Sequence, residues 1–341
     1  MRDKFRNIFM LFGIAVIVIM IFTFDVDMPE LLANLKRAGW QLPLIILLWV
    51  FIYFMNALSW FVIINDKQED RKVSFALVYK LTVSGFALNY ATPMGLMGGE
   101  PYRIMELSPY IGASRATSSV ILYVMMHIFS HLCFWASSIV LYLCCYPLNN
   151  AVGITFIIAG AAISFLIYLF MRGYRYGLAV KTLRICCRLP FVKNKARSFM
   201  QKQEETLVKI DRQIGQLHSQ RKTTFYFSLL LEYLARILGC VEIYMIMNVL
   251  TNEVSFVACI LISAFSSLFA NLLFFSPMQL GVREGGLAIA VSQLGIPGAF
   301  GVYSGLIMRV RELFWIAVGV ALMKVGVFKE KTVKTEGSDG H

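Results

Sequence analysis

The chain has 341 residues, of which 58% are hydrophobic and only 15% are charged, and its formal net charge is +12 at pH 7. This composition is too apolar for a soluble globular protein and predicts an integral membrane protein. A helix needs roughly 20 apolar residues to cross a bilayer, so the length allows about six to eight membrane elements and no soluble catalytic domain. The Lys and Arg residues lie between hydrophobic segments, which favours a role in membrane topology and argues against nucleic-acid binding.

The N-terminal part predicts two membrane spans. An apolar run from Ile8 to Phe24 is too long for the core of a secretory signal and has no A-x-A cleavage site after it, which predicts an uncleaved first span. The loop from Asp25 to Gln41 is mildly acidic and is expected outside the cell. A second span, Leu42 to Ile64, then returns the chain to the cytoplasm.

The next apolar segment is broken by prolines and glycines. Ser74 to Tyr90 is short, contains Lys80, and leads into Thr92 to Arg103, which reads T-P-M-G-L-M-G-G-E-P-Y-R. Irregular backbone at membrane depth is tolerated only where it is buried in protein or lines a wet cavity. The segment therefore predicts a re-entrant hairpin that opens to the cytoplasm and has its break at a polar cavity.

The middle of the chain carries the strongest topology signal. Two further spans, Ala116 to Leu143 and Ala151 to Met171, are joined by a short uncharged turn. The following segment, Arg172 to Lys222, holds thirteen Lys or Arg residues and three acidic ones, so it is expected in the cytoplasm. Its apolar residues recur at helical spacing, which favours a connector helix lying along the bilayer.

The second half repeats the pattern of the first. Thr224 to Leu250 is a predicted span, and Val254 to Phe275 then enters from the outer face, breaks at Ser276 to Gly286 and returns outward over Leu287 to Leu294. The last span, Gly301 to Lys324, brings the C-terminal tail to the cytoplasm.

These segments predict an all-α polytopic membrane protein with about six full spans and two oppositely oriented re-entrant helical hairpins that form an inverted repeat. Residues 1–328 form one membrane domain, with a first half at 42–143, a second half at 224–324, the basic cytoplasmic connector at 172–222 and a flexible cytoplasmic tail at 329–341. Both breaks fit the pattern [ST]-P-M-x-L-x-x-x-E, at 92–100 and 276–284. Paired broken segments at matching positions indicate a substrate site at the interface of two repeats.

Charged groups inside a membrane are costly and are therefore candidates for function. The predicted substrate-binding or coupling residues lie in the two breaks: Gly98, Gly99, Glu100, Arg103, Gly281, Arg283 and Glu284. Glycines allow close backbone approach, Arg283 suits phosphate oxygens, and Glu100 and Glu284 suit a cationic headgroup, a coupling proton or a neighbouring arginine.

Glu232, Arg236 and Arg309 are predicted supporting residues. Glu232 and Arg236 are four residues apart on one predicted helix, so the expectation is a structural ion pair between them. His127 and His131 have the same spacing, but no acidic H-E-x-x-H partner accompanies them, which favours polar packing or a proton relay over a metal site. No cofactor is expected, and the chain has no P-loop sequence.

At these same residues the chain resembles the flippase-like family of the lysylphosphatidylglycerol synthase transmembrane region, without the synthase domain. The matching pieces are P-M-G-L-M-G-G-E-P-Y-R at 93–103 and L-G-V-R-E-G-G at 280–286. The resemblance implies a multi-pass protein of the bacterial cytoplasmic membrane that moves a polar lipid between leaflets. It assigns Gly98, Gly99, Glu100 and Arg103, with Gly281, Arg283 and Glu284, as the family's motif residues.

The prediction for function is translocation of a polar, anionic or aminoacylated lipid through a cleft formed by the two hairpins, and not an enzyme. Its expected partners are membrane lipids, above all anionic phospholipid, with no nucleic acid, and an oligomer is compatible with the sequence. Two alternatives stay open: a transporter of a small anion or amphiphile, and a membrane-embedded enzyme acting on lipid-linked substrates. A cleft open sideways to the bilayer favours translocation, whereas catalytic geometry at Glu100 or His127 favours the enzyme.

Overall fold

A computed structural model describes residues 33, 36, 38–65, 72–91, 98–148, 150–176, 222–251, 254–273 and 281–324 of the chain. The predicted first span, the basic connector, residues 92–97 of the first break, residues 276–280 of the second break and the C-terminal tail lie outside these described residues.

The described residues form nine helices and no strand. In chain order the helices are α3 (Gln41–Ile64), α4 (Phe75–Ala91), α5 (Gly99–Ile111), α6 (Ala113–Cys145), α7 (Asn150–Tyr176), α10 (Lys222–Leu250), α11 (Phe256–Leu272), α12 (Val282–Ser292) and α13 (Gly298–Lys324). Within the described part, three helices are long and apolar enough to cross a membrane: α3, α6 and the Val152–Arg172 portion of α7. Helices α10 and α13 are of similar length but carry charged residues along their length.

The helices follow the apolar segments of the sequence, and two helix starts differ from the prediction. Helix α5 begins at Gly99 and α12 at Val282, so both start inside the segments predicted to be broken. Gly281, with φ of 72°, precedes α12, and Gly112, with φ of 84°, separates α5 from α6. Only glycine adopts such backbone angles readily, which fixes these two boundaries.

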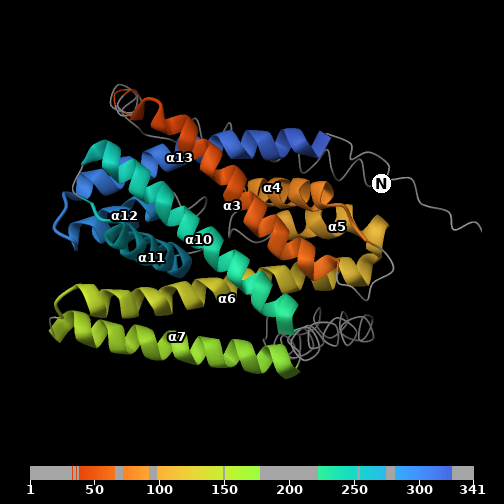
Figure 1. Ribbon diagram of the computed structural model, residues 1–341, viewed down its shortest axis with the longest axis horizontal. Coiled ribbons are helices and arrows are strands. Elements are labelled where there is room, and N and C mark those ends of the chain that lie inside the picture. The colour runs from red at the N-terminus through yellow and green to blue at the C-terminus, as the bar shows by residue number, and fades with distance from the viewer. Residues whose placement is uncertain are drawn as a thin grey trace, which may run out of the picture.

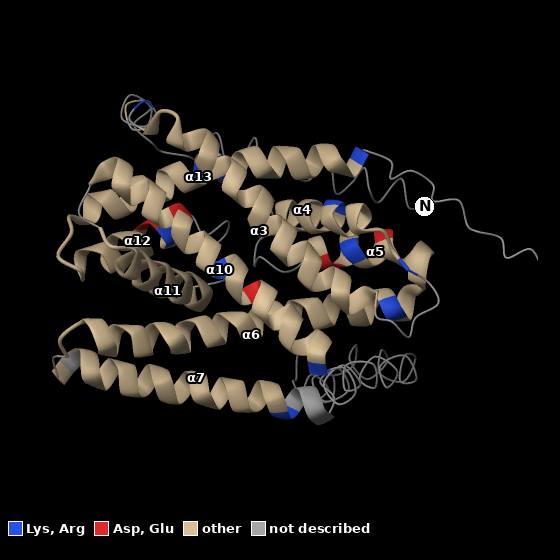
Figure 2. Cartoon of the chain, viewed as in Figure 1, with Lys and Arg blue, Asp and Glu red and all other residues tan. Residues whose placement is uncertain are grey.

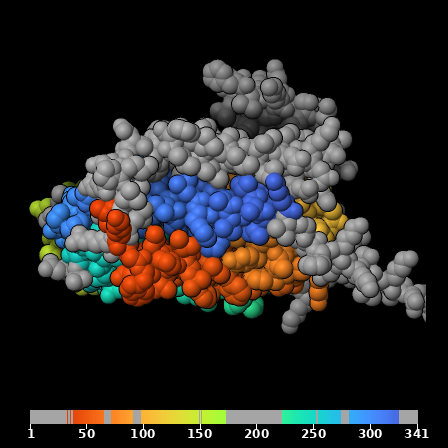
Figure 3. All heavy atoms as spheres, turned by 90° about the horizontal axis from the view of Figure 1, so that it is seen from above, coloured from red at the N-terminus to blue at the C-terminus, as the bar shows by residue number. Residues whose placement is uncertain are grey.

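Two pairs of short helices occupy opposite ends of the molecule. Helix α4 packs against α5 and α11 packs against α12. In Figure 1 the α4–α5 pair lies towards one end of the long axis and the α11–α12 pair towards the other, while α3 and α10 cross between them and α6 and α7 run along one side. Helix α13 packs against α4 as well as α12, so it connects the two pairs, and it lies beside α3 on the face seen in Figure 3.

Glycines allow α13 to approach both pairs closely. A Cβ atom on Gly301 would collide with the backbone of Ala288 in α12, and a Cβ atom on Gly319 would collide with Ala87 in α4. The Ser84 hydroxyl also donates to the Gly319 carbonyl at 2.9 Å. Small residues at helix crossings are typical of membrane proteins, where close backbone contact replaces the hydrophobic driving force.

Most charges of the described residues lie at one end of the bundle or in its interior. The basic residues at helix ends gather where α3, α5, α7 and α13 finish and α4, α6 and α10 begin (Figure 2). The outer faces carry large apolar side chains instead, among them Phe51 of α3, Ile157 and Phe165 of α7 and Leu230 of α10. A bundle that is apolar outside and charged inside is the arrangement expected of an integral membrane protein.

Candidate functional site

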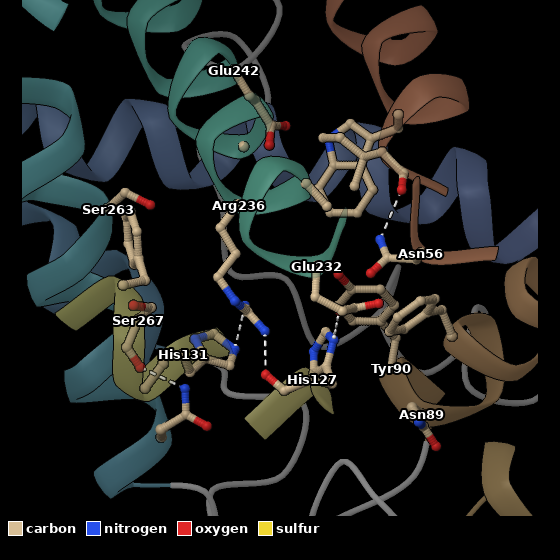
Figure 4. Close-up of a pocket in the computed structure, with 18 of the residues that line it drawn as sticks. Asn56, Asn89, Tyr90, His127, His131, Glu232, Arg236, Glu242, Ser263 and Ser267 are labelled. Atoms are coloured by element: carbon tan, nitrogen blue, oxygen red, sulfur yellow. Dashed lines mark hydrogen bonds and ion pairs between the residues drawn. The ribbon is translucent and has the colours of Figure 1, made fainter. Parts of the chain in front are cut away.

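A cavity of about 460 Å³ lies inside the bundle, and every described helix except α7 contributes to its lining. Its size is within the range of about 300–1,000 Å³ that is usual for small-ligand sites. The charged and imidazole groups in the lining are Glu100, Arg103, His127, His131, Glu232, Arg236, Glu242, Arg283 and Arg311. Figure 4 shows that side chains from helices far apart in the sequence, among them Asn56, His127 and Arg236, surround the same space.

The first motif is anchored by Asn89 of α4. The Asn89 side-chain oxygen accepts from the Gly99 backbone N–H at 2.8 Å, and its NH₂ group donates to Glu100 Oε1 at 2.8 Å. One amide therefore satisfies a free N–H at the start of α5 and orients the Glu100 carboxylate. Gly99 has no room for a side chain, because a Cβ atom there would collide with the Gly85 carbonyl.

Arg103 lies in the wall of the cavity, with 1% of its surface exposed. Its guanidinium donates to the Leu81 and Thr82 carbonyls at 3.4 and 3.2 Å and lies 3.4 Å from Glu100 Oε1. The rings of Trp60, Phe86 and Tyr123 surround its Cζ at 5.0 to 5.7 Å. These contacts join α5 to α3, α4 and α6, so the position of Arg103 in this structure suits a structural role.

The second motif belongs to a cluster of three arginines and three glutamates on α10, α12 and α13. Arg283 pairs with Glu312, and Glu284 accepts from Arg309 Nε at 2.9 Å. Glu242 of α10 accepts two hydrogen bonds from Arg311 at 2.8 and 3.2 Å. Because the positive and negative charges are equal in number, the cluster is close to neutral, as buried charges must be.

Several polar contacts join α6 to α10, and two of them involve histidine rings. Glu232 Oε2 lies 2.8 Å from His127 Nδ1, and Arg236 Nη1 lies 2.6 Å from His131 Nε2. Glu232 attracts the charge of Arg236, as the spacing on one helix predicts, but both side chains form their hydrogen bonds with histidines of the neighbouring helix. Each His of α6 is 105 residues before its partner, so the two helices run in the same direction where they cross.

Several lining residues were not predicted from the sequence. Asn56 of α3, Asn89 of α4 and a set of polar residues on α11 line the cavity; the α11 set is Ser263, Ser266, Ser267 and Asn271. Ser267 accepts a hydrogen bond from Trp135 Nε1 at 2.9 Å. The sequence does contain a signal for the α11 residues. Polar residues three and four apart on an otherwise apolar helix indicate a face that is turned away from lipid.

The predicted site residues lie in four places. The cavity lining brings together Glu100, Arg103, Arg283, Glu232 and Arg236. Glu284 and Arg309 belong to the adjoining ion cluster, and Gly98 is buried next to α5 at its start. Gly281 is exposed and serves the backbone turn before α12. Within the described residues no group of three or more His, Cys, Asp or Glu side chains is arranged to hold a metal ion.

An apolar exterior, three helices able to cross a membrane and a charged interior cavity define an integral membrane protein whose polar chemistry lies within the bundle. A model of the protein family described as the lysylphosphatidylglycerol synthase TM region matches residues 10–319, and the chain belongs to this family. No curated protein and no solved structure matches the chain. The family predicted from the two sequence motifs is therefore confirmed.

Proposed function

We propose that this protein translocates a polar lipid between the leaflets of a bacterial cytoplasmic membrane and that it is not an enzyme. The observation that carries the proposal is the cavity, because it combines partly exposed charged groups of both motifs inside a bundle with an apolar surface. The side chains of Glu100 and Arg283 are 17% and 19% exposed there, and they come from the two different helix pairs. A volume of about 460 Å³ suits a headgroup, while acyl chains stay in the surrounding lipid.

The proposed membrane arrangement has six spans and two re-entrant hairpins. The α4–α5 pair enters from the cytoplasmic face and the α11–α12 pair from the outer face, which gives an inverted repeat. The starts of α4, α6 and α10 and the end of α13 lie on one side of the molecule (Figure 1), and Lys72, Arg115, Lys222 and Lys324 are at or near these helix ends in the sequence. This arrangement supports a cytoplasmic position for that side and, with it, for both termini. Helices α10 and α13 cross the membrane with their charges turned towards the cavity and the ion cluster.

Translocation then requires that the two helix pairs expose the cavity to one leaflet and afterwards to the other. Broken helices at the centre of a transporter provide charged groups at membrane depth, where a headgroup otherwise loses its hydration. An anionic or aminoacylated phospholipid suits this lining, because arginines and glutamates are both present in it.

The contacts of the acidic and imidazole groups favour transport over catalysis. Glu100 accepts from Asn89 and Arg103, and His127 contacts Glu232. Neither contact pairs a base with a nucleophile, which hydrolysis or group transfer through a covalent intermediate needs.

The test is leaflet exchange of fluorescent phosphatidylglycerol in proteoliposomes, followed by the accessibility of its label to dithionite. Wild type should accelerate exchange over empty liposomes, whereas an Arg283→Ala, Glu100→Gln double variant should not. Arg172→Ala, at an exposed residue of α7, is the matched control and should behave as wild type. If wild type exchanges no lipid but takes up inorganic phosphate in a manner that the double variant abolishes, small-anion transport replaces lipid translocation.

A further inference from the structure

The arginines that line the cavity differ in how exposed they are and in whether they contact a carboxylate. Arg103 and Arg311 are 1% and 2% exposed, and each contacts a carboxylate. Arg283 reaches the cavity, but it pairs with Glu312. Arg236 is only half-buried, so a ligand in the cavity can reach it.

Arg236 is held by three neutral acceptors of α6. Its Nε donates to Ser130 Oγ at 2.8 Å, its Nη1 to His131 Nε2 at 2.6 Å and its Nη2 to the His127 carbonyl at 2.5 Å. Figure 4 shows the guanidinium directed between the two histidines. These acceptors fix the plane of the guanidinium and none of them is anionic, although Glu232 on the same helix attracts its charge.

The contact between Arg236 and His131 determines which nitrogen of the His131 ring is protonated. A guanidinium only donates, so His131 Nε2 must be the unprotonated nitrogen of a neutral ring. The nearest carboxylate on α10 is Glu232, one turn away, and it contacts His127. A guanidinium has five N–H groups, of which three are used here, so two remain to donate to a ligand.

We infer that Arg236, oriented by Ser130, His127 and His131, is the binding subsite for a phosphate group in this cavity. The inference rests on the proposed function and deepens it by naming the chemical group that the cavity recognises. A guanidinium with a fixed plane and free N–H groups matches the oxygens of a phosphate in two-point geometry. Phospholipid headgroups and free phosphate share this group, and the experiment distinguishes them.

Binding is measured by calorimetry on the purified full-length protein in detergent, with three probes. They are dihexanoyl phosphatidylglycerol, inorganic phosphate and dihexanoylglycerol, which lacks phosphate. Arg236→Gln should weaken binding of the phosphatidylglycerol by about 10- to 100-fold, the loss expected for one or two charge-assisted hydrogen bonds. Arg236→Lys, which keeps the charge but not the fork, should bind with intermediate affinity, and Arg172→Gln should bind as wild type.

Ser130→Ala provides a second variant that keeps the charge of Arg236 and removes one restraint on its plane, and it should weaken binding by a few-fold. Binding is compared only between variants whose unfolding midpoints equal that of wild type. A loss of affinity then reflects the subsite and not the fold. Competition by inorganic phosphate that depends on Arg236 supports recognition of the phosphate itself. Equal affinity for dihexanoylglycerol, or an Arg236→Gln variant that binds phosphatidylglycerol as wild type does, overturns the inference.

Leaflet exchange measured on the same variants separates this inference from the proposed function. If wild type exchanges phosphatidylglycerol and Arg236→Gln binds and exchanges it equally well, the phosphate subsite is wrong and translocation stands. If phosphate binds in an Arg236-dependent manner and no lipid is exchanged, the subsite stands and lipid translocation is wrong.

Discussion

The buried pair between Glu242 and Arg311 allows a quantitative test of how the interior charges stabilise the bundle. Their side chains are 3% and 2% exposed and share two hydrogen bonds, of 2.8 and 3.2 Å. Removing one member of such a pair leaves an uncompensated buried charge, which costs about 3–5 kcal/mol. Glu242→Gln should therefore lower the free energy of unfolding by about this amount. Glu312 lies 3.8 Å from Arg311 but is shared with two other arginines, so it replaces only part of the loss.

The double variant Glu242→Gln, Arg311→Met should be less destabilised than the two single variants together. It removes both charges, and Met retains apolar contact with Trp49, whose ring lies 3.8 Å from the Arg311 Cζ. The double variant should cost at least about 2 kcal/mol less than the sum of the two single variants, because neither charge is then left unpaired. A pair with no coupling would instead give additive costs.

The measurement is unfolding in mixed micelles by titration with sodium dodecyl sulfate, followed by circular dichroism. Arg172→Gln is the control, and it should change the free energy of unfolding by no more than about 0.5 kcal/mol because Arg172 is exposed. Single variants as stable as wild type, or additivity within about 0.5 kcal/mol, would refute the reasoning.

Three further predictions address packing, backbone conformation and topology. Gly99→Ala should destabilise the α4–α5 pair in the same unfolding assay, whereas Gly160→Ala, which meets open space, should not; equal effects would contradict the close helix approach. Gly112→Ala also meets open space, so its cost of about 1–3 kcal/mol should come from the positive φ alone, and an unchanged stability would argue against that backbone angle. In a cysteine-free background, Tyr110→Cys at the end of α5 should react with an impermeant thiol reagent from the cytoplasmic side and Gln293→Cys after α12 from the outer side; labelling of both from one side would exclude oppositely oriented hairpins.

The positions of the helices were largely predictable, because the length of an apolar run determines them. The predicted span from Leu42 to Ile64 corresponds to α3, which begins one residue earlier. The start of α12 was predicted five residues too late, because Arg283, Glu284 and two glycines resemble an irregular segment in sequence. In the structure the charges are satisfied by arginine and glutamate partners on α13, so the helix can begin at Val282.

The residues of the site were predictable, but their partners were not. Each pair on α6 and α10 was visible as two polar residues four apart on one helix. Which residues meet across the two helices depends on the register between the helices. The sequence pattern of either segment alone does not determine that register. Glu232 attracts the charge of Arg236, but the hydrogen bonds of these two side chains go to His127 and His131 on the adjacent helix, so the structural role of the pair stays a prediction. The expected substrate role of Arg103 stays a prediction.

The glycine contacts of α13 have a mechanical consequence. A Cβ atom on Gly305 would meet Glu284 of α12, and one on Gly319 would meet α4, so one rigid helix touches both helix pairs at points fourteen residues, or about 21 Å, apart. Glu312, which contacts three arginines, lies midway between these points. If α13 tilts like a lever about its centre, its two contact points move in opposite directions while Glu312, near the pivot, moves least. The carboxylate that contacts three arginines is thus placed where a tilt of α13 moves it least.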